Sequence, residues 1–330
     1  MPARIFITGA AGYVGGQTTG LLMSTHPEYE VVALVRNEEQ ALKVKGRWPE
    51  INTVIGTLDD HAILRQESTK AAVVLQLASS DHISCIEPLI SGLATSGGKM
   101  VHISGTGVLN DASTGFGNPA PKIFDDVKDI EEITSLDQSA LHRNVDDAVI
   151  TGGKQHNVPT AIICPPLIYG IGEGPVKKRS IQIPFLTEAI LKRGRAFTVG
   201  DGKNVWDHIH VSDVAKACVF LVEEALKPQG SAQWGPTGYY FVESGEFAWR
   251  EVSEAIAQLV KEEGKLEAAD VDPLSVDEAL KFHPWAPVLW GGNCRSRASR
   301  LRSMGWKPEG PTLWEALPAM VKAEIAALKP

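Results

Sequence analysis

The sequence predicts an α/β protein in which a doubly wound parallel sheet is followed by a smaller C-terminal lobe. Through the first half of the chain, short strand-like runs alternate with helical stretches, as expected for a parallel sheet. These runs are continuously apolar, as strands covered by helices on both faces require. After Cys164 the alternation ends, and Gly- and Pro-rich loops, amphipathic helices and Trp-containing turns follow. This change of pattern indicates the second lobe.

The expected elements follow one another in order along the chain. In the first half, apolar runs predict strands at 4–8, 30–35, 52–56, 72–78, 99–104 and 159–164, and the segments between them predict helices at 13–25, 38–46, 60–69, 83–97 and 136–155. In the second half, we expect helices at 183–194, 211–226 and 248–264, a strand at 238–244, and short helices and turns from residue 270.

Charge and composition argue against several classes of protein. The 330 residues carry a formal net charge of -8, whereas nucleic-acid binding needs a basic face, so nucleic-acid binding is not expected even though the stretch at 293–309 is basic. No apolar run approaches the roughly 20 residues that span a bilayer. The four cysteines contain no CxxC pair, so no metal site is indicated. No signal-peptide pattern precedes the first strand, and we expect a cytoplasmic protein with reduced thiols.

A glycine triplet follows the first predicted strand and opens the first predicted helix. Gly9, Gly12 and Gly15 are spaced as GxxGxxG. Glycines permit a tight turn and a close approach of the backbone to a pyrophosphate, and the helix N-terminus offers free N–H groups. A tight turn that binds nothing is the alternative. The motif predicts a Rossmann-type dinucleotide site, with contacts from Gly9, Ala11, Gly12, Tyr13, Val14 and Gly15.

The end of the second strand indicates which dinucleotide is preferred. NAD-binding sites place a carboxylate about 20 residues beyond the glycine loop, where it holds the ribose 2′-hydroxyl. Here the strand ends in Arg36 and Asn37, and Glu38 is the nearest acidic residue. An arginine can pair with a 2′-phosphate, which favours NADP(H). A surface arginine that tolerates either cofactor is the alternative.

Five further motifs resemble the short-chain dehydrogenase/reductase superfamily, in its extended, epimerase/dehydratase-like branch. "TGAAGYVG" matches the glycine motif of that branch, "GTLDD" and "LQLASS" are similar to its strand-three and strand-four motifs, and "CPPLIYG" and "TVGDGKNVWDHIHVSDVAKA" resemble two longer ones. The resemblance covers nearly the whole chain, and it implies that the basic stretch at 293–309 is a helix packed on the substrate lobe. It implies an NAD(P)-binding Rossmann domain at 1–165, with 198–245 returning to it, and a substrate-binding lobe at 166–197 and 246–330. It also implies cofactor contacts from Leu58, Ala78, Ser79, Pro165, Leu167 and Ile168.

The sequence departs from this branch at its catalytic pair. The family uses Tyr-x-x-x-Lys, in which the lysine lowers the pKa of the tyrosine and binds the nicotinamide ribose, and no such pair occurs in this chain. Alignment places Gln138 at the tyrosine and His142 at the lysine. His142 can hydrogen-bond the cofactor ribose or act as an acid or base. At helical spacing, Gln138, His142 and Asp146 share one face, so Asp146 is expected to orient His142. An ordinary helix pair without a catalytic role is the alternative.

Other candidate site residues come from the same alignment. Gly105 takes the place of the family's helper hydroxyl, so Ser104 and Thr106 on either side are candidates to hydrogen-bond a substrate carbonyl, or simply to cap a turn. Tyr169 and Trp206 are candidate substrate contacts, although Tyr169 fits a structural role better. Cys164 and Trp206 stand where the family has arginines that suit phosphate groups, which argues against a nucleotide sugar.

Two functions remain open from the sequence, and a third is disfavoured. The first is an NADP(H)-dependent oxidoreductase that reduces a small apolar or aromatic carbonyl compound with a non-standard active site. The second is a catalytically silent NADP(H) sensor, indicated by the missing Tyr-x-x-x-Lys pair. A nucleotide-sugar epimerase or dehydratase is the third. We expect a small-molecule substrate, no nucleic-acid or membrane partner, and a monomer or homodimer.

Overall fold

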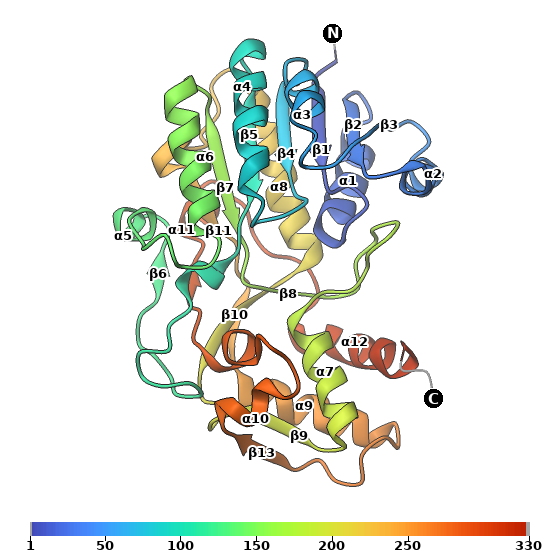
Figure 1. The fold of residues 1–330 in the computed structure, drawn as a ribbon, viewed down its shortest axis with the longest axis vertical. Coiled ribbons are helices and arrows are strands. Elements are labelled where there is room, and N and C mark those ends of the chain that lie inside the picture. Colours follow the sequence, from blue (N-terminus) through green and yellow to red (C-terminus); the bar gives the residue numbers. More distant parts are fainter. Residues whose placement is uncertain (1, 328–330) are drawn as a thin grey trace.

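The computed structural model describes residues 2–327 and has the predicted parallel sheet at its centre (Figure 1). Seven parallel strands lie in the order β11-β7-β5-β4-β1-β2-β3, as expected for a doubly wound sheet. The predicted strands are confirmed, with ends shifted by at most three residues. Their bounds are β1 Arg4–Thr8, β2 Glu30–Val35, β3 Asn52–Ile55, β4 Val73–Gln76, β5 Lys99–Ile103, β7 Thr160–Cys164 and β11 Tyr239–Phe241.

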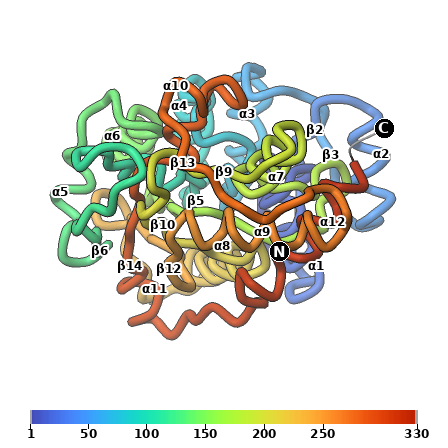
Figure 2. The backbone as a smooth tube through the Cα atoms, turned by 90° about the horizontal axis from the view of Figure 1, so that it is seen from below, coloured from blue at the N-terminus to red at the C-terminus, as the bar shows by residue number. Residues whose placement is uncertain are grey.

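Helices cover both faces of this sheet, which explains why its strands are apolar throughout. Helices α3 (His61–Ser68), α4 (Ile86–Ser96) and α6 (Arg143–His156) pack in one row, and α1 (Tyr13–Thr25) packs against α8 (Val211–Leu226) (Figure 2). Helix α2 (Glu38–Arg47) packs beside β2 and β3. Among residues 2–327 no helix combines the length and the apolar character needed to cross a membrane.

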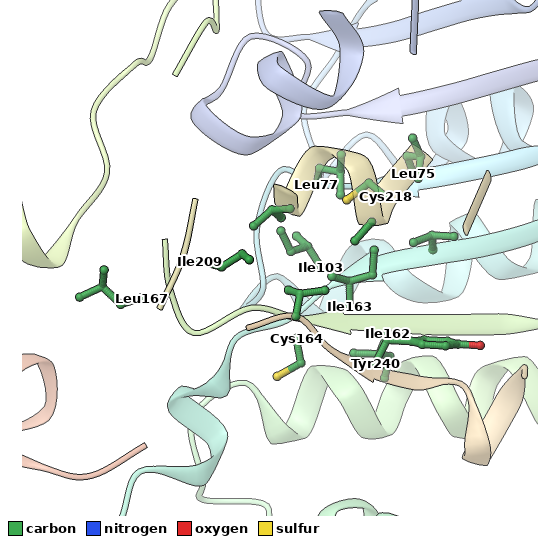
Figure 3. Packing of buried hydrophobic residues seen from close by; sticks show 14 of the residues in the cluster. Leu75, Leu77, Ile103, Ile162, Ile163, Cys164, Leu167, Ile209, Cys218 and Tyr240 are labelled. Carbon is green, nitrogen blue, oxygen red and sulfur yellow. The ribbon is translucent and has the colours of Figure 1, made fainter. Parts of the chain in front are cut away.

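The interior of the sheet is packed with aliphatic side chains. Ile103 and Ile163 on adjacent strands β5 and β7 lie near Leu75 of β4, and Cys218 of α8 approaches them from one side (Figure 3). All four side chains are at most 7% exposed. Burial of this kind contributes roughly 25 cal/mol for each Å² of apolar surface removed from water. The core therefore fixes the ends of the strands, where the cavity described below opens.

The remaining strands form small sheets beyond the carboxyl ends of the main sheet. Strands β8 (Leu167–Tyr169), β10 (Val205–His210) and β12 (Gly245–Ala248) form one, and β9 (Ala196–Val199) pairs with β13 (Val271–Leu274). Within the segment 198–245, which was expected to return to the Rossmann domain, α8 and β11 belong to the seven-stranded sheet and its helices. Strand β10 lies in a small sheet instead. Helices α7 (Gln182–Arg193), α9 (Trp249–Glu262) and α10 (Val276–Leu280) surround these strands. The expectation of only short helices after residue 270 is wrong at α12 (Leu313–Ala327).

Helix α6 begins at Arg143, so the expected helix over 136–155 is too long at its start. Residues before it form a short helix, α5 (Ile130–Thr134), and then turns. The carboxylate of Asp137 accepts hydrogen bonds from Ser139 N and Oγ, at 2.8 and 2.6 Å, which favours a turn over a helix. Gln138 therefore lies outside the helix, and the expected shared face of Gln138, His142 and Asp146 does not form.

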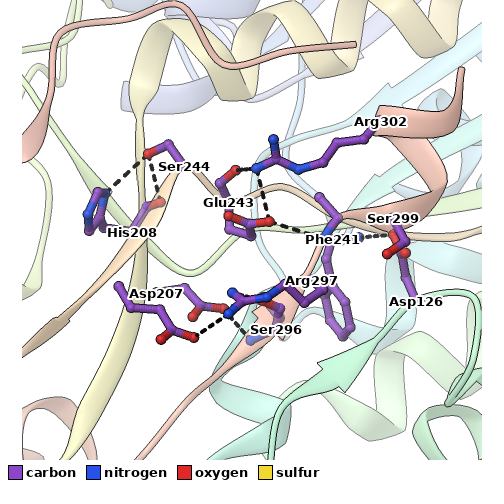
Figure 4. A network of polar contacts seen from close by, with 12 residues as sticks. Asp126, Asp207, His208, Phe241, Glu243, Ser244, Ser296, Arg297, Ser299 and Arg302 are labelled. Carbon is purple, nitrogen blue, oxygen red and sulfur yellow. Dashed lines mark hydrogen bonds and ion pairs between the residues drawn. The ribbon is translucent and has the colours of Figure 1, made fainter. Parts of the chain in front are cut away.

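The basic stretch near residues 293–309 is neutralised inside the fold. Arg302 pairs with Glu243 at 3.0 Å (Figure 4). Arg295 and Arg297 both pair with Glu246. The neighbouring short strand β14 (Ser296–Arg297) pairs with β6 (Phe124–Asp125), and the short helix α11 (Ser299–Ser303) packs against β11. These arginines hold the C-terminal segment on the molecule, as the packed-segment interpretation requires.

Candidate active site

A cavity of about 560 Å³ opens at the carboxyl ends of the parallel strands. The loops after β1, β2, β3, β4, β5 and β7 line one side of it, and residues 176–182 line the other. This is where open α/β sheets bind ligands. The structure brings most of the predicted residues to this cavity. They are Gly9, Ala11, Gly12, Tyr13, Val14, Arg36, Leu58, Ala78, Ser79, Ser104, Pro165 and Ile168.

The glycine loop has the shape that a dinucleotide requires. Gly9 has a φ of +87°, and a Cβ added there would lie 2.7 Å from the carbonyl carbon of Leu77. Gly12 precedes the first turn of α1 and makes no side-chain cap, so the first N–H groups of the helix face the cavity without a capping side chain. Gly15 does not line the cavity, but a Cβ there would lie 2.2 Å from Gly9 O. Its role is to let helix and loop pack closely.

Arg36 lies at the end of the cavity that is nearest to β2. Its side chain is exposed and forms no salt bridge within residues 2–327, and its backbone N–H donates to Gln40 Oε1 at 3.1 Å. At the neighbouring Thr57, the hydroxyl donates to Asp60 Oδ2 at 2.9 Å. The carboxylate of Asp60 is therefore already occupied by Thr57. The guanidinium of Arg36 remains available for an anionic group.

A second loop, residues 170–181, lies against the glycine loop, although it was expected in the substrate lobe and not at the dinucleotide site. The backbone N–H groups of Val176 and Lys177 both donate to Ala11 O at 3.2 Å, and Tyr13 Oη donates to Gly170 O at 2.8 Å. A Cβ at Gly174 would lie 2.1 Å from Gly12 O. The repeated glycines of "YGIGEG" were the available sequence signal for this close contact. The loop adds Val176, Lys177, Arg179, Ser180, Ile181 and Gln182 to the cavity wall.

Asp146 of α6 is buried beside Ser104 rather than beside the imidazole of His142. Its Oδ2 accepts hydrogen bonds from Ser104 Oγ at 3.0 Å and Tyr239 Oη at 2.9 Å. Its Oδ1 has no hydrogen-bond partner within residues 2–327 and lies 3.9 Å from Nε2 of the fully buried His102. Burial raises the pKa of Asp146 to about 6 and lowers that of His102 to about 3. The expected pairing of Asp146 with His142 is thus wrong.

Replacing Asp146 with asparagine is expected to remove a pH-dependent cost to stability. Because the pKa in the folded state lies above the ordinary value of 3.8, ionisation destabilises the fold as the pH rises through about 4 to 6. The substituted side chain retains an acceptor for Ser104 and Tyr239 and presents an N–H toward His102. At pH 8 we expect Asp146→Asn to raise the free energy of unfolding by at most about 3 kcal/mol, and with it the melting temperature. This advantage should disappear toward pH 4.

Thermal denaturation of both proteins between pH 4 and pH 8 measures this difference. Asp137→Asn is the control, because Asp137 lies in an exposed turn where hydrogen bonds from Ser139 lower the pKa of its carboxyl. A stability difference that does not vary with pH would contradict the assignment of a raised pKa to Asp146.

His142 is held against the end of the cavity by a different carboxylate, that of Asp81. The distance from His142 Nδ1 to Asp81 Oδ1 is 2.6 Å, and the side chain of His142 is 19% exposed. The hydrogen bond from this imidazole lowers the pKa of the Asp81 carboxyl. His142 does not line the cavity itself. Its Nε2 lies 3.1 Å from the position that a Cβ at Gly105 would take, and Gly105 directly follows Ser104 in the cavity wall.

Comparison with known proteins identifies the family of the chain. Residues 131–232 match the NAD dependent epimerase/dehydratase family. The protein "Oxidase ucsJ" of Acremonium sp is 33% identical, with 99% of each chain aligned. The chain belongs to the NAD-dependent epimerase/dehydratase family. An uncharacterised protein of Saccharomyces cerevisiae is 24% identical over 96% of this chain and 98% of the relative.

Solved structures of the epimerase/dehydratase family share the fold. The dTDP-glucose 4,6-dehydratase of Bacillus anthracis in complex with NAD superposes with a TM-score of 0.70 at 16% identity, covering 98% of this chain and 97% of the other. The UDP-glucose 4-epimerase of Thermotoga maritima with UDP-glucose gives 0.67 at 15% identity, covering 99% and 100%. The agreement confirms the Rossmann-type α/β architecture in a chain related to NAD-binding, short-chain dehydrogenase-type oxidoreductases.

Several residues predicted from the epimerase/dehydratase motifs have structural positions instead. Trp206, expected to contact substrate, is 4% exposed, lies outside the cavity wall and donates from Nε1 to Gly292 O at 2.7 Å. Tyr169 is also buried, and its hydroxyl donates to Pro311 O at 2.7 Å. Leu167 is buried in β8, and Thr106 Oγ1 is buried against Cys294 Sγ at 2.9 Å. The structure therefore leaves Ser104 and the ring of His142 as the predicted polar groups nearest to the inner end of the cavity.

Proposed function

We propose that the protein is an NADP(H)-dependent oxidoreductase that reduces a small apolar or aromatic carbonyl compound. Apolar side chains in the cavity wall carry this proposal. They include Pro166, Val176 and Ile181, and the last two side chains are 40% and 58% exposed. Such a surface suits an apolar substrate better than a phosphorylated one. The relative named an oxidase supports redox chemistry.

The residues around the cavity fit a dinucleotide along its whole length. Gly9 and Gly12 leave room for the pyrophosphate at the start of α1, and Lys177, anchored through its backbone to Ala11, adds positive charge beside it. Ser79 and Ser104 offer hydroxyl groups farther along the wall, and Ile168 and Pro165 offer apolar surface for the nicotinamide. The bound cofactor would supply the hydride, while the protein orients the two reactants and excludes water.

The preference for NADP(H) rests on Arg36. We expect Arg36→Ala to weaken NADPH binding by roughly 10-fold, because a charge-assisted contact with the 2′-phosphate would be lost. Binding of NADH, which lacks that phosphate, should change less than about 2-fold. Isothermal titration of both cofactors against both proteins measures the two effects. Equal losses for NADPH and NADH would contradict the proposed preference.

Turnover distinguishes the oxidoreductase from a silent sensor. Purified protein is first titrated with NADPH, and oxidation of NADPH is then followed by absorbance with aromatic and aliphatic aldehydes, ketones and quinones. We expect substrate-dependent oxidation with at least one apolar compound. Binding of NADPH without oxidation by any of these compounds would favour the sensor. Stabilisation by a UDP- or dTDP-sugar in thermal denaturation would favour the nucleotide-sugar alternative.

A further inference from the structure

We propose that His142, positioned by Asp81, donates the proton in the reduction, in place of the missing Tyr-x-x-x-Lys pair. The proposal rests on the oxidoreductase function proposed above. It differs from the expectation that Asp146 orients this histidine, because the structure assigns that role to a residue that follows β4. His142 is then a catalytic residue, and Asp81 is a positioning residue that acts through it.

The two groups are placed at the end of the cavity by elements that also form its wall. Asp81 directly follows Ser80, which lines the cavity, and His142 lies against Gly105, which directly follows Ser104. The hydrogen bond of 2.6 Å fixes the His142 ring through Nδ1. Nε2 is left facing Gly105 and Gly107, at 3.1 and 3.3 Å from the positions that a Cβ on each would take. A carboxylate on one ring nitrogen and a free second nitrogen are the arrangement that general acids use.

The two glycines make the space that the imidazole occupies. A side chain at Gly105 would crowd Nε2, and Gly105 is the position at which the sequence lacks the expected helper hydroxyl. Nε2 therefore lies where a side chain at that position would project. Pro165 O, from the cavity wall, lies 3.9 Å from the same point. The missing side chain at Gly105 thus leaves the space that the imidazole of His142 occupies.

The backbone of His142 supports a functional placement. Its φ of +65° lies in the left-handed region, which only one other non-glycine residue of the described chain, Asn157, adopts. Such a conformation costs energy for a side-chain-bearing residue and concentrates at functional sites. The turn directs the side chain to Asp81, away from the face of α6 that carries Asp146. A helical φ would have carried the ring along α6 instead.

The other candidate donors are already committed. The hydroxyl hydrogen of Ser104 is directed to Asp146 Oδ2, and Thr106 is 1% exposed against Cys294. Ser104 would have to break a buried hydrogen bond in order to donate to a substrate. Thr106 Oγ1 accepts from the Cys294 thiol, and its side chain is closed off from solvent. His142 keeps 19% of its side chain exposed, so it can recover a proton from water after each cycle.

The reaction then balances with the proposed cofactor. The bound cofactor would supply a hydride to the carbonyl carbon, and the electron pair of the C=O π bond would move to oxygen. The N–H bond at His142 Nε2 breaks, and its proton passes to that oxygen. The products are the alcohol, the oxidised cofactor and a neutral imidazole, which still donates from Nδ1 to Asp81.

The chain provides a matched control pair for the test. His82 is also partly exposed and hydrogen-bonds through Nε2 to Asp59 at 2.9 Å, but the ring that lies against Gly105 and Gly107 is that of His142. We expect His142→Ala to lower kcat at least about 100-fold with unchanged NADPH affinity, because general acid catalysis contributes this much or more. Asp81→Asn should lower kcat about 10-fold with little change in KM. His82→Ala and Asp59→Asn should remain within 2-fold of the unmodified protein for both parameters, at roughly the scatter expected of surface changes.

Chemical rescue separates a catalytic imidazole from a structural one. Free imidazole should restore part of the kcat of His142→Ala by entering the space beside Gly105 and Gly107, and should leave His82→Ala unaffected. If His142→Ala does not fold, His142→Gln retains a side chain of similar size and should show the same loss of kcat.

Two results would overturn the proposal. One is a folded His142 variant with the kcat of the unmodified protein, or one whose lost kcat imidazole does not restore. The other is a Ser104→Ala variant that loses turnover while His142→Ala retains it, which would make Ser104 the donor. An unmodified protein that binds NADPH but oxidises it with none of the carbonyl compounds overturns the oxidoreductase function itself, and this outcome is distinct from both.

Discussion

Gly9→Ala is expected to abolish NADP(H) binding while leaving a folded protein. Gly9 combines a φ of +87° with an added-Cβ distance of 2.7 Å to both the carbonyl carbon and the oxygen of Leu77. Those neighbours are backbone atoms of the segment after β4, so they cannot move aside as a flexible side chain can. The loop must shift instead, and it carries the N–H groups that face the pyrophosphate. We expect the dissociation constant for NADPH to rise by about 100-fold or more, since roughly 3 kcal/mol of contacts would be lost.

Isothermal titration with NADPH and far-UV circular dichroism measure binding and folding separately. Gly46→Ala is the matched control, because Gly46 lies in α2 with no atom within 4 Å of an added Cβ. That change should leave NADPH binding intact and slightly stabilise the helix. Retention of full NADPH affinity by Gly9→Ala would show that the loop after β1 does not cradle the cofactor.

Trp206→Ala is expected to lower the free energy of unfolding by about 3–5 kcal/mol, the range for emptying a large buried aromatic site. The indole is 4% exposed and packs edge-to-face on Trp249, with ring centroids 6.3 Å apart. Its removal leaves a cavity and also leaves the carbonyl of Gly292 without the indole N–H. This large effect belongs to stability rather than to substrate recognition, because Trp206 lies outside the cavity wall.

Denaturant unfolding measures the loss, and NADPH titration under native conditions shows whether the site is preserved. Trp285→Ala serves as the control for removing a tryptophan, because Trp285 is 53% exposed. It should change stability by less than about 1 kcal/mol. A Trp206→Ala protein with unchanged stability but weaker substrate binding would support the original interpretation of Trp206 as a substrate contact.

The strand pattern and the glycine loop were predictable because they depend on local sequence. Strands buried on both faces must be apolar throughout, so the runs ending at Thr8, Val35 and Cys164 could be recognised directly. The helix at Val211–Leu226 was predicted to the residue because its apolar residues repeat with helical spacing. By contrast, the start of α6 was misplaced by seven residues, since the turn at Asp137 competes with the helix through side-chain hydrogen bonds.

The residues of the candidate site were predictable only where a single sequence motif contributes several of them to the cavity wall. Eleven predicted cofactor contacts line the cavity, and most of them come from the loops directly after strands. Trp206 was misassigned because the absence of the family's arginine indicates only that a phosphate contact is missing. It does not indicate which way the tryptophan side chain points. The loop at 170–181 was recognised as a Gly- and Pro-rich loop but was not assigned to the dinucleotide site, because its contact with Ala11 joins backbone atoms and the glycines that permit it do not indicate their partner.

The sequence by itself determined the doubly wound sheet, the dinucleotide loop, the arginine at the end of β2 and the absence of Tyr-x-x-x-Lys, because each depends on residue type and local spacing. The tertiary structure decided which carboxylate serves which group. Asp146 was expected to orient His142 from four residues away, but a left-handed turn at His142 directs its ring to Asp81, 61 residues earlier in the chain. Asp146 is buried with Ser104 and Tyr239 instead. Only the folded chain shows these partners, because the hydrogen bond joins residues far apart in the sequence and the turn at His142 cannot be read from local spacing.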